Sequence, residues 1–298
     1  MVSNASEFSS HPKPPAQDAT ETRRSHRWVQ PALIGFVLLY LGLVLFIPAV
    51  NVFVQAFGGG IDRFLHTFTE RNFQSAVKLT IFVALIAVPL NTVFGLCAAW
   101  AIARNKKFPG RALLISIIDL PFSVSPVVAG LMLILLYGRN GWFGSLLEAN
   151  DIKIIFALPG IVLATAFVSM PFVAREVIPV LEEVGTEQEE AAKTLGASEW
   201  QTFWRVVLPS IRWGVLYGVI LTNARAMGEF GAVAVVSGSI AGRTQTLPLF
   251  VEEAYKQYQT PSAYTAAVLL ACLAIVTMVS KALLEHKIGT SSRSGAGH

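Results

Sequence analysis

Residues 190–209 read EAAKTLGASEWQTFWRVVLP, a polar stretch between two long apolar runs that we place at residues 154–174 and 212–237. Each of these runs is long enough to cross a lipid bilayer as a helix, which takes roughly 20 apolar residues. The chain therefore leaves the membrane, forms an ordered polar segment and enters the membrane again. A polar segment of this kind raises the question of whether another protein docks on it.

The composition supports a membrane protein. The 298 residues are 53% hydrophobic and only 14% charged, and the mean hydropathy is +0.56. An ordinary soluble domain has about 25% charged residues. The net charge of +4 does not indicate a nucleic-acid partner, because the basic residues gather beside the apolar runs, where they orient membrane proteins.

Six apolar runs predict an all-α integral membrane protein with about six transmembrane helices. We expect spans near residues 32–56, 77–103, 112–138, 154–174, 212–237 and 263–284. Several runs contain prolines, which membrane helices tolerate where neighbouring helices surround the freed backbone groups. Kinked helices around a pathway are therefore expected.

The basic residues of the connecting segments predict the orientation. With six crossings, fifteen Lys and Arg residues fall on the side that holds both termini and the polar stretch, and six fall on the other side. The positive-inside rule then makes both termini cytoplasmic. Residues 1–30 are predicted to be a disordered tail and not a signal peptide, residues 31–286 a transmembrane domain with its loop at 176–209, and residues 287–298 a second cytoplasmic tail.

The residue pattern predicts two short helices in the polar stretch. Residues up to Thr194 favour a helix, Gly196 suits a helix end, and Ser198 can cap a second helix that runs to Val206. Trp200, with Phe203 and Trp204, gives this second helix an apolar face of the kind that protein interfaces favour. An amphipathic hairpin on the lipid surface is the alternative, and the residues alone favour neither interpretation.

The spacing within the stretch resembles the EAA signature of ABC-importer permeases, with Val206 in place of the usual Ile. That resemblance implies that this loop seats in a cleft of a separate ATPase, through Glu190, Ala191, Ala192, Leu195, Gly196, Val206, Leu208 and Pro209. The chain has no GxxxxGK[ST] phosphate-binding loop of its own. ATP and Mg are therefore expected to bind to partner ATPase subunits, and no cofactor or metal is expected in this chain.

A pair of charged residues stands in the fifth apolar run. Arg225 and Glu229 are four residues apart, hence on one face of a helix. Charges inside a membrane are costly and face a partner, the bundle interior or a water-filled cavity. The simpler interpretation is a mutually neutralising pair, and direct contact with a transported substrate is the alternative.

The segment around this pair, Asn223 to Ala232, resembles the permeases of oxyanion importers for sulfate, thiosulfate and molybdate. Two short segments that follow, Val236–Gly238 and Gly242–Leu249, resemble more closely the W-type permeases of sulfate/thiosulfate importers. This implies a type I importer fold in the bacterial inner membrane, a T-type permease as heterodimer partner, two ATP-binding subunits and a periplasmic sulfate/thiosulfate-binding protein. Molybdate or another oxyanion stays open as the substrate.

A doubly charged anion needs hydrogen-bond donors to leave water. Polar residues at the outer end of the fifth run are candidates for its path: Ser237, Ser239, Arg243, Thr244 and Thr246. Gly214 and Gly218 form a GxxxG spacing that suits close helix packing, for example between two permeases. A stand-alone channel or carrier would make no use of an EAA-type loop, and no HExxH motif or nucleophilic Ser motif indicates an intramembrane enzyme.

Overall fold

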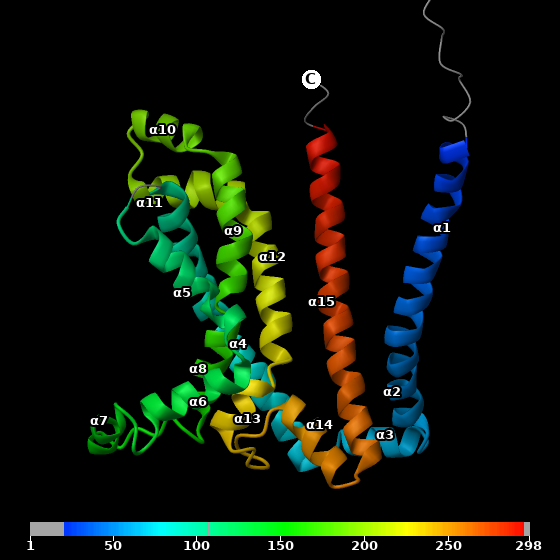
Figure 1. Ribbon diagram of the computed structural model, residues 1–298. Helices are drawn as coiled ribbons and strands as arrows, with labels where there is room; N and C mark the ends of the chain where they lie inside the picture. Colours follow the sequence, from blue (N-terminus) through cyan, green and yellow to red (C-terminus); the bar gives the residue numbers. More distant parts are fainter. Residues whose placement is uncertain (1–20, 106–107, 295–298) are drawn as a thin grey trace, which may run out of the picture. The chain divides into compact units, whose positions relative to one another are not determined.

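The computed structural model describes residues 21–105 and 108–294, and the regular secondary structure of these residues is helical throughout (Figure 1). The chain divides into two units, Met1–Asn51 and Val52–His298. The elements are α1 (Glu21–Leu41), the π-helical segment η1 (Gly42–Phe46), α2 (Ile47–Phe57), α3 (Ile61–Thr67), α4 (Arg71–Arg104), α5 (Arg111–Ser123), α6 (Pro126–Tyr137), α7 (Gly144–Ala149), α8 (Leu158–Ser169), α9 (Pro171–Val184), α10 (Glu187–Thr194), α11 (Glu199–Thr202), the π-helical segment η2 (Phe203–Val207), α12 (Leu208–Met227), α13 (Gly231–Ser237), α14 (Leu247–Lys256) and α15 (Thr260–Ser294).

The first unit consists of α1, η1 and the start of α2. The apolar stretch Pro31–Phe57, which runs from this unit into the second, is long and apolar enough to span a membrane. Helix α1 begins at Glu21, within the predicted tail at 1–30. Residues 1–20 lie outside the described residues.

Three helices form the centre of the second unit. Helix α9 packs against both α4 and α12, and α8 packs against α4 beside them. The cluster that holds them together is built from small and branched apolar side chains: Ala99, Ala103, Val173, Val177, Leu181, Val207 and Ile211. An amide also links two of these helices, because the buried side chain of Asn91 donates to Ala166 O at 3.0 Å and to Ser169 Oγ at 2.8 Å.

Glycines allow this close packing. A Cβ on Gly95 of α4 would lie 2.7 Å from Val173 Cβ, and one on Gly218 of α12 would lie 3.0 Å from Val173 Cα. A Cβ on Gly214 would lie 3.0 Å from a methyl group of Val180. The close helix packing predicted from the GxxxG spacing is confirmed, and the helix that it contacts is α9 of the same chain.

The third predicted span is broken. Helices α5 and α6 meet at 113°, with Val124 and Ser125 extended between them. Pro126 is the cause, since a proline disfavours helical backbone at the residue before it. Helix α6 instead packs on α13 and α8.

The fourth and fifth spans are displaced from their predicted bounds. The fourth is Leu158–Val184, so that α9 extends eight residues beyond residue 176, where the loop was expected to begin. The fifth is Glu199–Met227: it starts in the polar stretch, and it ends ten residues before residue 237. The second short helix thus continues past Pro209 instead of stopping. The π-helical segment η2 relieves the clash that the proline ring makes with the carbonyl one turn earlier.

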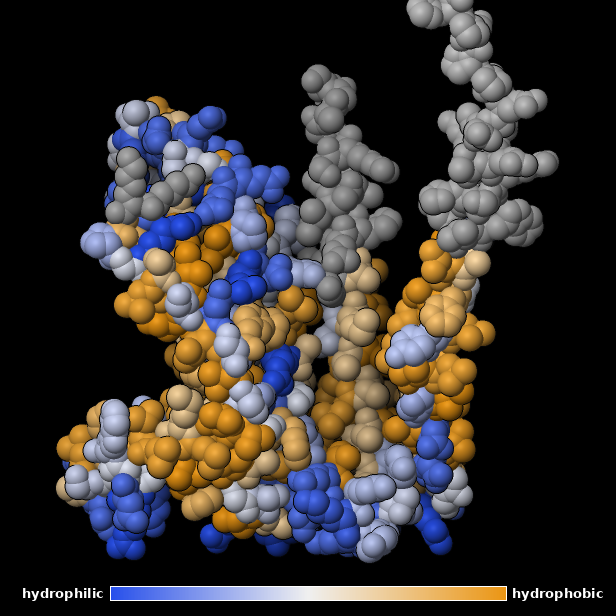
Figure 2. Space-filling view, viewed as in Figure 1, coloured by the Kyte–Doolittle hydropathy of each residue, from blue (hydrophilic) through white to orange (hydrophobic). Residues whose placement is uncertain are grey.

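The sixth span, Thr260–Ser280, belongs to α15, which extends to Ser294 through eight residues of the predicted C-terminal tail. Residues 295–298 lie outside the described residues. Within the described residues, five helices are long and apolar enough to cross a membrane, or six with the bent α5–α6 pair. In the second unit, apolar side chains cover mainly the middle of the helices, and hydrophilic ones gather at α10–α11 and at α3 and α14 (Figure 2).

Candidate functional site

Helices α10 and α11, with η2, form a hairpin (Glu187–Val207) that we call the coupling hairpin after the role that the resemblance to the EAA signature implies. Gly196 ends α10 with φ +87°, as predicted. Its amide donates to Lys193 O, and the amide of Ala197 donates to Ala192 O, both at 3.0 Å. This is the Schellman arrangement, which only glycine adopts without steric cost.

Two further interactions hold the second arm of the hairpin. Ser198 caps α11 in a reciprocal capping box with Gln201, which confirms the predicted cap. The Lys193 ammonium lies 2.7 Å from the carboxylate of Glu199 across the turn. This hydrogen bond raises the pKa of Lys193 above its ordinary value. The hairpin is therefore ordered by its own residues.

Apolar side chains project from the hairpin into open space. Leu195 at the turn is 89% exposed, Trp200 is 70% exposed and Trp204 is 49% exposed. Phe203 differs from its prediction, because it is half-buried against Trp100 of α4, with ring centroids 5.3 Å apart. Of the other predicted coupling residues, Glu190, Ala191, Gly196 and Pro209 are exposed, and Ala192, Val206 and Leu208 are half-buried.

The opposite side of the hairpin is tied to α4 by a buried ion pair that the sequence analysis did not single out. Arg104, the last residue of α4, lies 2.6 Å from a carboxylate oxygen of Glu189, and both side chains are 9% exposed. A second nitrogen of Arg104 donates to Leu181 O at 2.7 Å. In the sequence analysis, Arg104 is one of the basic residues that predict the orientation. Glu190 is the glutamate of the EAA pattern, and no role is predicted for Glu189.

The predicted pair of charges in the fifth span is an ion pair, with Arg225 Nη2 2.7 Å from Glu229 Oε2. Its setting differs from a continuous helix face, since α12 ends at Met227. Glu229 is 3% exposed and also accepts the amide of Ala232 at 2.9 Å, in the first turn of α13. One carboxylate thus joins the end of α12 to the start of α13.

The candidate anion-path residues lie in the turn between α13 and α14. The Thr244 hydroxyl donates to Ser237 O at 2.7 Å and accepts the amide of Ile240, and Ser237 Oγ accepts the amide of Ser239. These two hydroxyls therefore hold the turn itself. Thr246 is 4% exposed and its hydroxyl has no partner among the described residues, whereas Arg243 is exposed.

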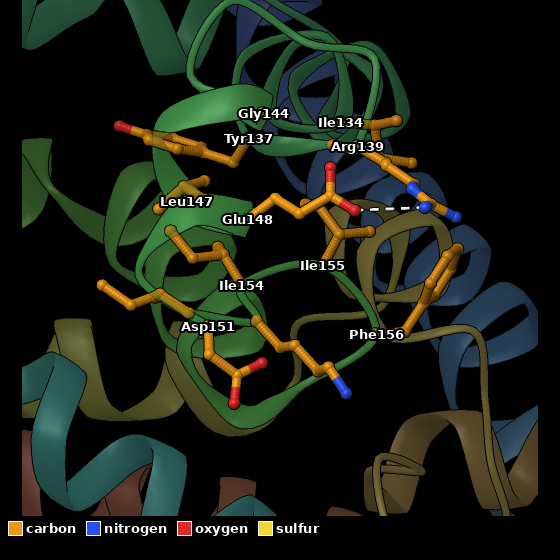
Figure 3. A pocket seen from close by; sticks show the side chains of 13 residues that line it. Ile134, Tyr137, Arg139, Gly144, Leu147, Glu148, Asp151, Ile154, Ile155 and Phe156 are labelled. Atoms are coloured by element: carbon orange, nitrogen blue, oxygen red, sulfur yellow. Dashed lines mark hydrogen bonds and ion pairs between the residues drawn. The ribbon is translucent and has the colours of Figure 1, made fainter.

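A cavity of about 520 Å³ lies at the α6–α7 end of the second unit (Figure 3). Arg139 and Glu148 form an ion pair at 3.1 Å on its wall, and Asp151, Lys153 and the apolar side chains of Ile134 and Tyr137 also line it. The charges between the third and fourth spans were the only sequence signal for it. Among the described residues no cluster of three or more His, Cys, Asp or Glu side chains could hold a metal ion.

Comparisons with known proteins place these features in a family. The model for the "Binding-protein-dependent transport system inner membrane component" matches residues 93–290. The "Sulfate transport system permease protein CysW" of Synechococcus elongatus is 69% identical over 88% of this chain and 91% of its own length. The protein of the same name from Escherichia coli K12 is 49% identical over 89% and 91%, and the E. coli K12 "Sulfate transport system permease protein CysT" is 38% identical over 89% and 94%.

A solved structure shares the fold. A chain of a bacterial ABC transporter involved in the import of alginate superposes with a TM-score of 0.72 over 89% of this chain and 96% of its own, at 17% identity. The predicted ABC-importer permease fold and the resemblance to W-type permeases are thereby confirmed. This chain belongs to the family of inner membrane components of binding-protein-dependent transport systems.

Proposed function

We propose that the chain is the membrane-spanning permease subunit of an ATP-driven sulfate/thiosulfate importer. The observation that carries this proposal is the 69% identity, over nearly nine tenths of the chain, to a permease named for sulfate transport. The sequence pattern of the coupling hairpin supports the ATP-driven part. Since the chain has no phosphate-binding loop, ATP and Mg would bind to a separate subunit.

The coupling hairpin is the proposed contact with that ATPase. Exposed Leu195, Trp200 and Trp204 are apolar anchors suited to a cleft on a partner, because burying large apolar side chains drives protein association. When two ATPase subunits close on ATP, each would move the hairpin seated in it. The movement would then pass to the membrane helices and alternate the pathway between its outward and inward openings.

The assembly proposed for this chain has further members. Relatives named CysW and CysT are both sulfate permeases, which supports a heterodimer of this chain with a T-type permease. A structural neighbour is a transporter in complex with a substrate-bound periplasmic protein, which supports a periplasmic binding protein as the donor of the anion. Both termini and the coupling hairpin would then face the cytoplasm, as the distribution of Lys and Arg predicts.

The turn between α13 and α14 is the proposed receiving point for the anion. Ser237 and Thr244 would shape this turn, while Arg243, Ser239 and the Thr246 hydroxyl, which has no partner among the described residues, would supply donors. Arg225 would stay a structural residue, because Glu229 neutralises it. Molybdate is the second candidate substrate, since it has the same charge and shape.

The test is an ATPase assay on the purified complex, reconstituted in lipid with its copurifying subunits. The binding protein is added empty or loaded with sulfate, thiosulfate or molybdate. We expect sulfate or thiosulfate to stimulate ATP hydrolysis and to drive uptake of the labelled anion into vesicles. Stimulation by molybdate alone would move the assignment to the second candidate, and ATP-independent uptake would overturn the proposed class.

A further inference from the structure

Helix α10 is attached to the rest of the protein at few points. It has eight residues, and glycines with positive φ lie beyond each end, Gly185 at +69° and Gly196 at +87°. Glu189 is the one buried residue of this helix. A second contact, from Ser210 Oγ to Gln188 at 3.3 Å, is exposed. Glu189 is therefore the main point at which α10 is held against the membrane helices.

Arg104 receives this attachment at the end of α4. Its Nε donates to the Glu189 carboxylate at 2.8 Å, and its Nη1 donates to Leu181 O of α9 at 2.7 Å. One turn earlier, Trp100 packs edge-on against Phe203 of the other hairpin arm at 5.3 Å. Both arms of the hairpin thus bear on the last turn of α4, one through a charged pair and one through an aromatic pair.

Helix α4 runs from this point to the opposite end of the second unit (Figure 1). Its 34 residues span about 50 Å at 1.5 Å per residue. Near its other end Thr80 accepts the amide of Leu247, the first residue of α14, and Asn72 lies against Gly242. A displacement of Arg104 along the helix axis would therefore reach the turn between α13 and α14, which holds the candidate anion residues.

We propose that Arg104 and Glu189 form a clamp through which the coupling hairpin moves α4, and that this clamp determines how many anions are transported per ATP hydrolysed. The proposal rests on the proposed function of the hairpin. Both residues are positioning residues, and neither contacts ATP or the anion. A buried ion pair of this kind suits the role, because one planar guanidinium donates Nε to the Glu189 carboxylate and Nη1 to Leu181 O, which fixes its orientation between the hairpin and α9.

The decisive variant is Glu189→Gln, which keeps the shape of the side chain and removes its charge. It is measured in the full complex in lipid vesicles, with anion uptake and ATP hydrolysis recorded together. We expect the ATPase subunits to copurify as in the wild type, hydrolysis to stay within about twofold, and anions transported per ATP to fall at least tenfold. Arg104→Lys keeps the positive charge but loses the planar guanidinium. We expect its number of anions transported per ATP to lie between those of the wild type and of Glu189→Gln.

Glu182→Gln is the matched control. Glu182 pairs with Arg111 at 3.4 Å between α9 and α5, at the same end of the protein but outside the hairpin. We expect its transport ratio to stay within twofold of the wild type. An unchanged ratio in Glu189→Gln would overturn the clamp, and so would loss of the copurifying ATPase in both Glu189→Gln and Arg104→Lys. If the wild-type complex itself shows no ATP-driven uptake, the proposed function fails instead.

Discussion

Glu229 meets three requirements at the residue scale. It neutralises Arg225, it caps α13 through the amide of Ala232, and it is buried to 3% exposure at the break between two helices. A carboxylate satisfies all three, because it can accept hydrogen bonds on both oxygens while it carries the charge. A side chain that meets fewer of these three requirements should therefore give a less stable protein.

We predict that Glu229→Gln assembles less complex than the wild type and that Glu229→Ala assembles much less. Glutamine keeps an acceptor for the Ala232 amide, whereas alanine leaves a buried amide and a cation without partners, at a cost of about 3–5 kcal/mol. The amount of copurifying complex measures this order, with Glu252→Ala, which removes a half-buried partner of Lys256, as the control. Normal assembly of Glu229→Ala with altered anion selectivity would show that the pair serves the pathway instead.

Gly196 is the second residue with a sharp test. Its φ of +87° costs other residues about 1–2 kcal/mol, although Asn tolerates the left-handed region. No described residue of this chain lies within 4 Å of a Cβ built there, so that within the chain the backbone conformation sets the cost of a substitution. We expect Gly196→Asn to keep most of the ATP-driven uptake and Gly196→Val to lose about tenfold. Equal uptake by the two variants would show that the turn is not required.

Sequence reasoning at this scale identified residues whose signal is local. The helix end at Gly196 and the cap at Ser198 follow from backbone preferences, and both are confirmed. The pair of Arg104 and Glu189 is 85 residues apart in sequence, and nothing in either local pattern indicates the contact. Single-sequence patterns do not carry contacts of this range.

At the element scale, α9 packs closely between α4 and α12 because both of these helices have a glycine at the contact. Val173 fits between Gly95 and Gly218, and a methyl group at either glycine would press on it. The close approach allows dispersion contacts along three helices, which replace the hydrophobic driving force that lipid does not supply. The packing is therefore sensitive to single methyl groups.

We predict that Gly95→Ala destabilises the complex by about 1–3 kcal/mol, the usual cost of an overpacked contact. Its Cβ would lie 2.7 Å from Val173 Cβ and 3.0 Å from the amide nitrogen of Ala174. Thermal unfolding of the purified complex measures the loss, and Val173→Ala in the same chain should recover part of it. The control is Gly35→Ala, which meets nothing within 4 Å. An unchanged unfolding temperature for Gly95→Ala would contradict the packing account.

Hydropathy predicted how many apolar segments there are but not where each helix bends or ends. The bend between α5 and α6 comes from Pro126, which the sequence shows but whose effect neighbouring helices decide. Before Pro209, by contrast, the backbone forms the π-helical segment η2, and the helix continues through the proline. The prolines therefore predicted where the helices are irregular, but not at which proline a helix would end.

At the scale of the whole molecule, orientation is the main statement that rests on sequence alone. The coupling hairpin and the α7 region lie at opposite ends of the second unit (Figure 1). The excess of Lys and Arg on the hairpin's side predicts that this end is cytoplasmic. Trp142 and Leu195, 85% and 89% exposed, mark the two ends.

We predict that Trp142→Cys reacts with a membrane-impermeant maleimide on spheroplasts, in which the outer membrane and cell wall have been opened. Leu195→Cys should react only after the membrane is opened. Both variants are made in a chain whose two cysteines, Cys97 and Cys272, are replaced by alanine. The opposite labelling pattern would reverse the topology and remove the hairpin from the side where ATP is hydrolysed.

The most direct test of the account is capture of the ATP-binding subunit by the coupling hairpin. Leu195→Asp places a charge on the exposed apolar turn, and Trp142→Asp does the same at the opposite end as a control. We predict that Leu195→Asp loses the copurifying ATPase and the ATP-driven uptake of sulfate, while Trp142→Asp keeps the ATPase bound. A Leu195→Asp complex with the full amount of ATPase and wild-type uptake would contradict the central claim.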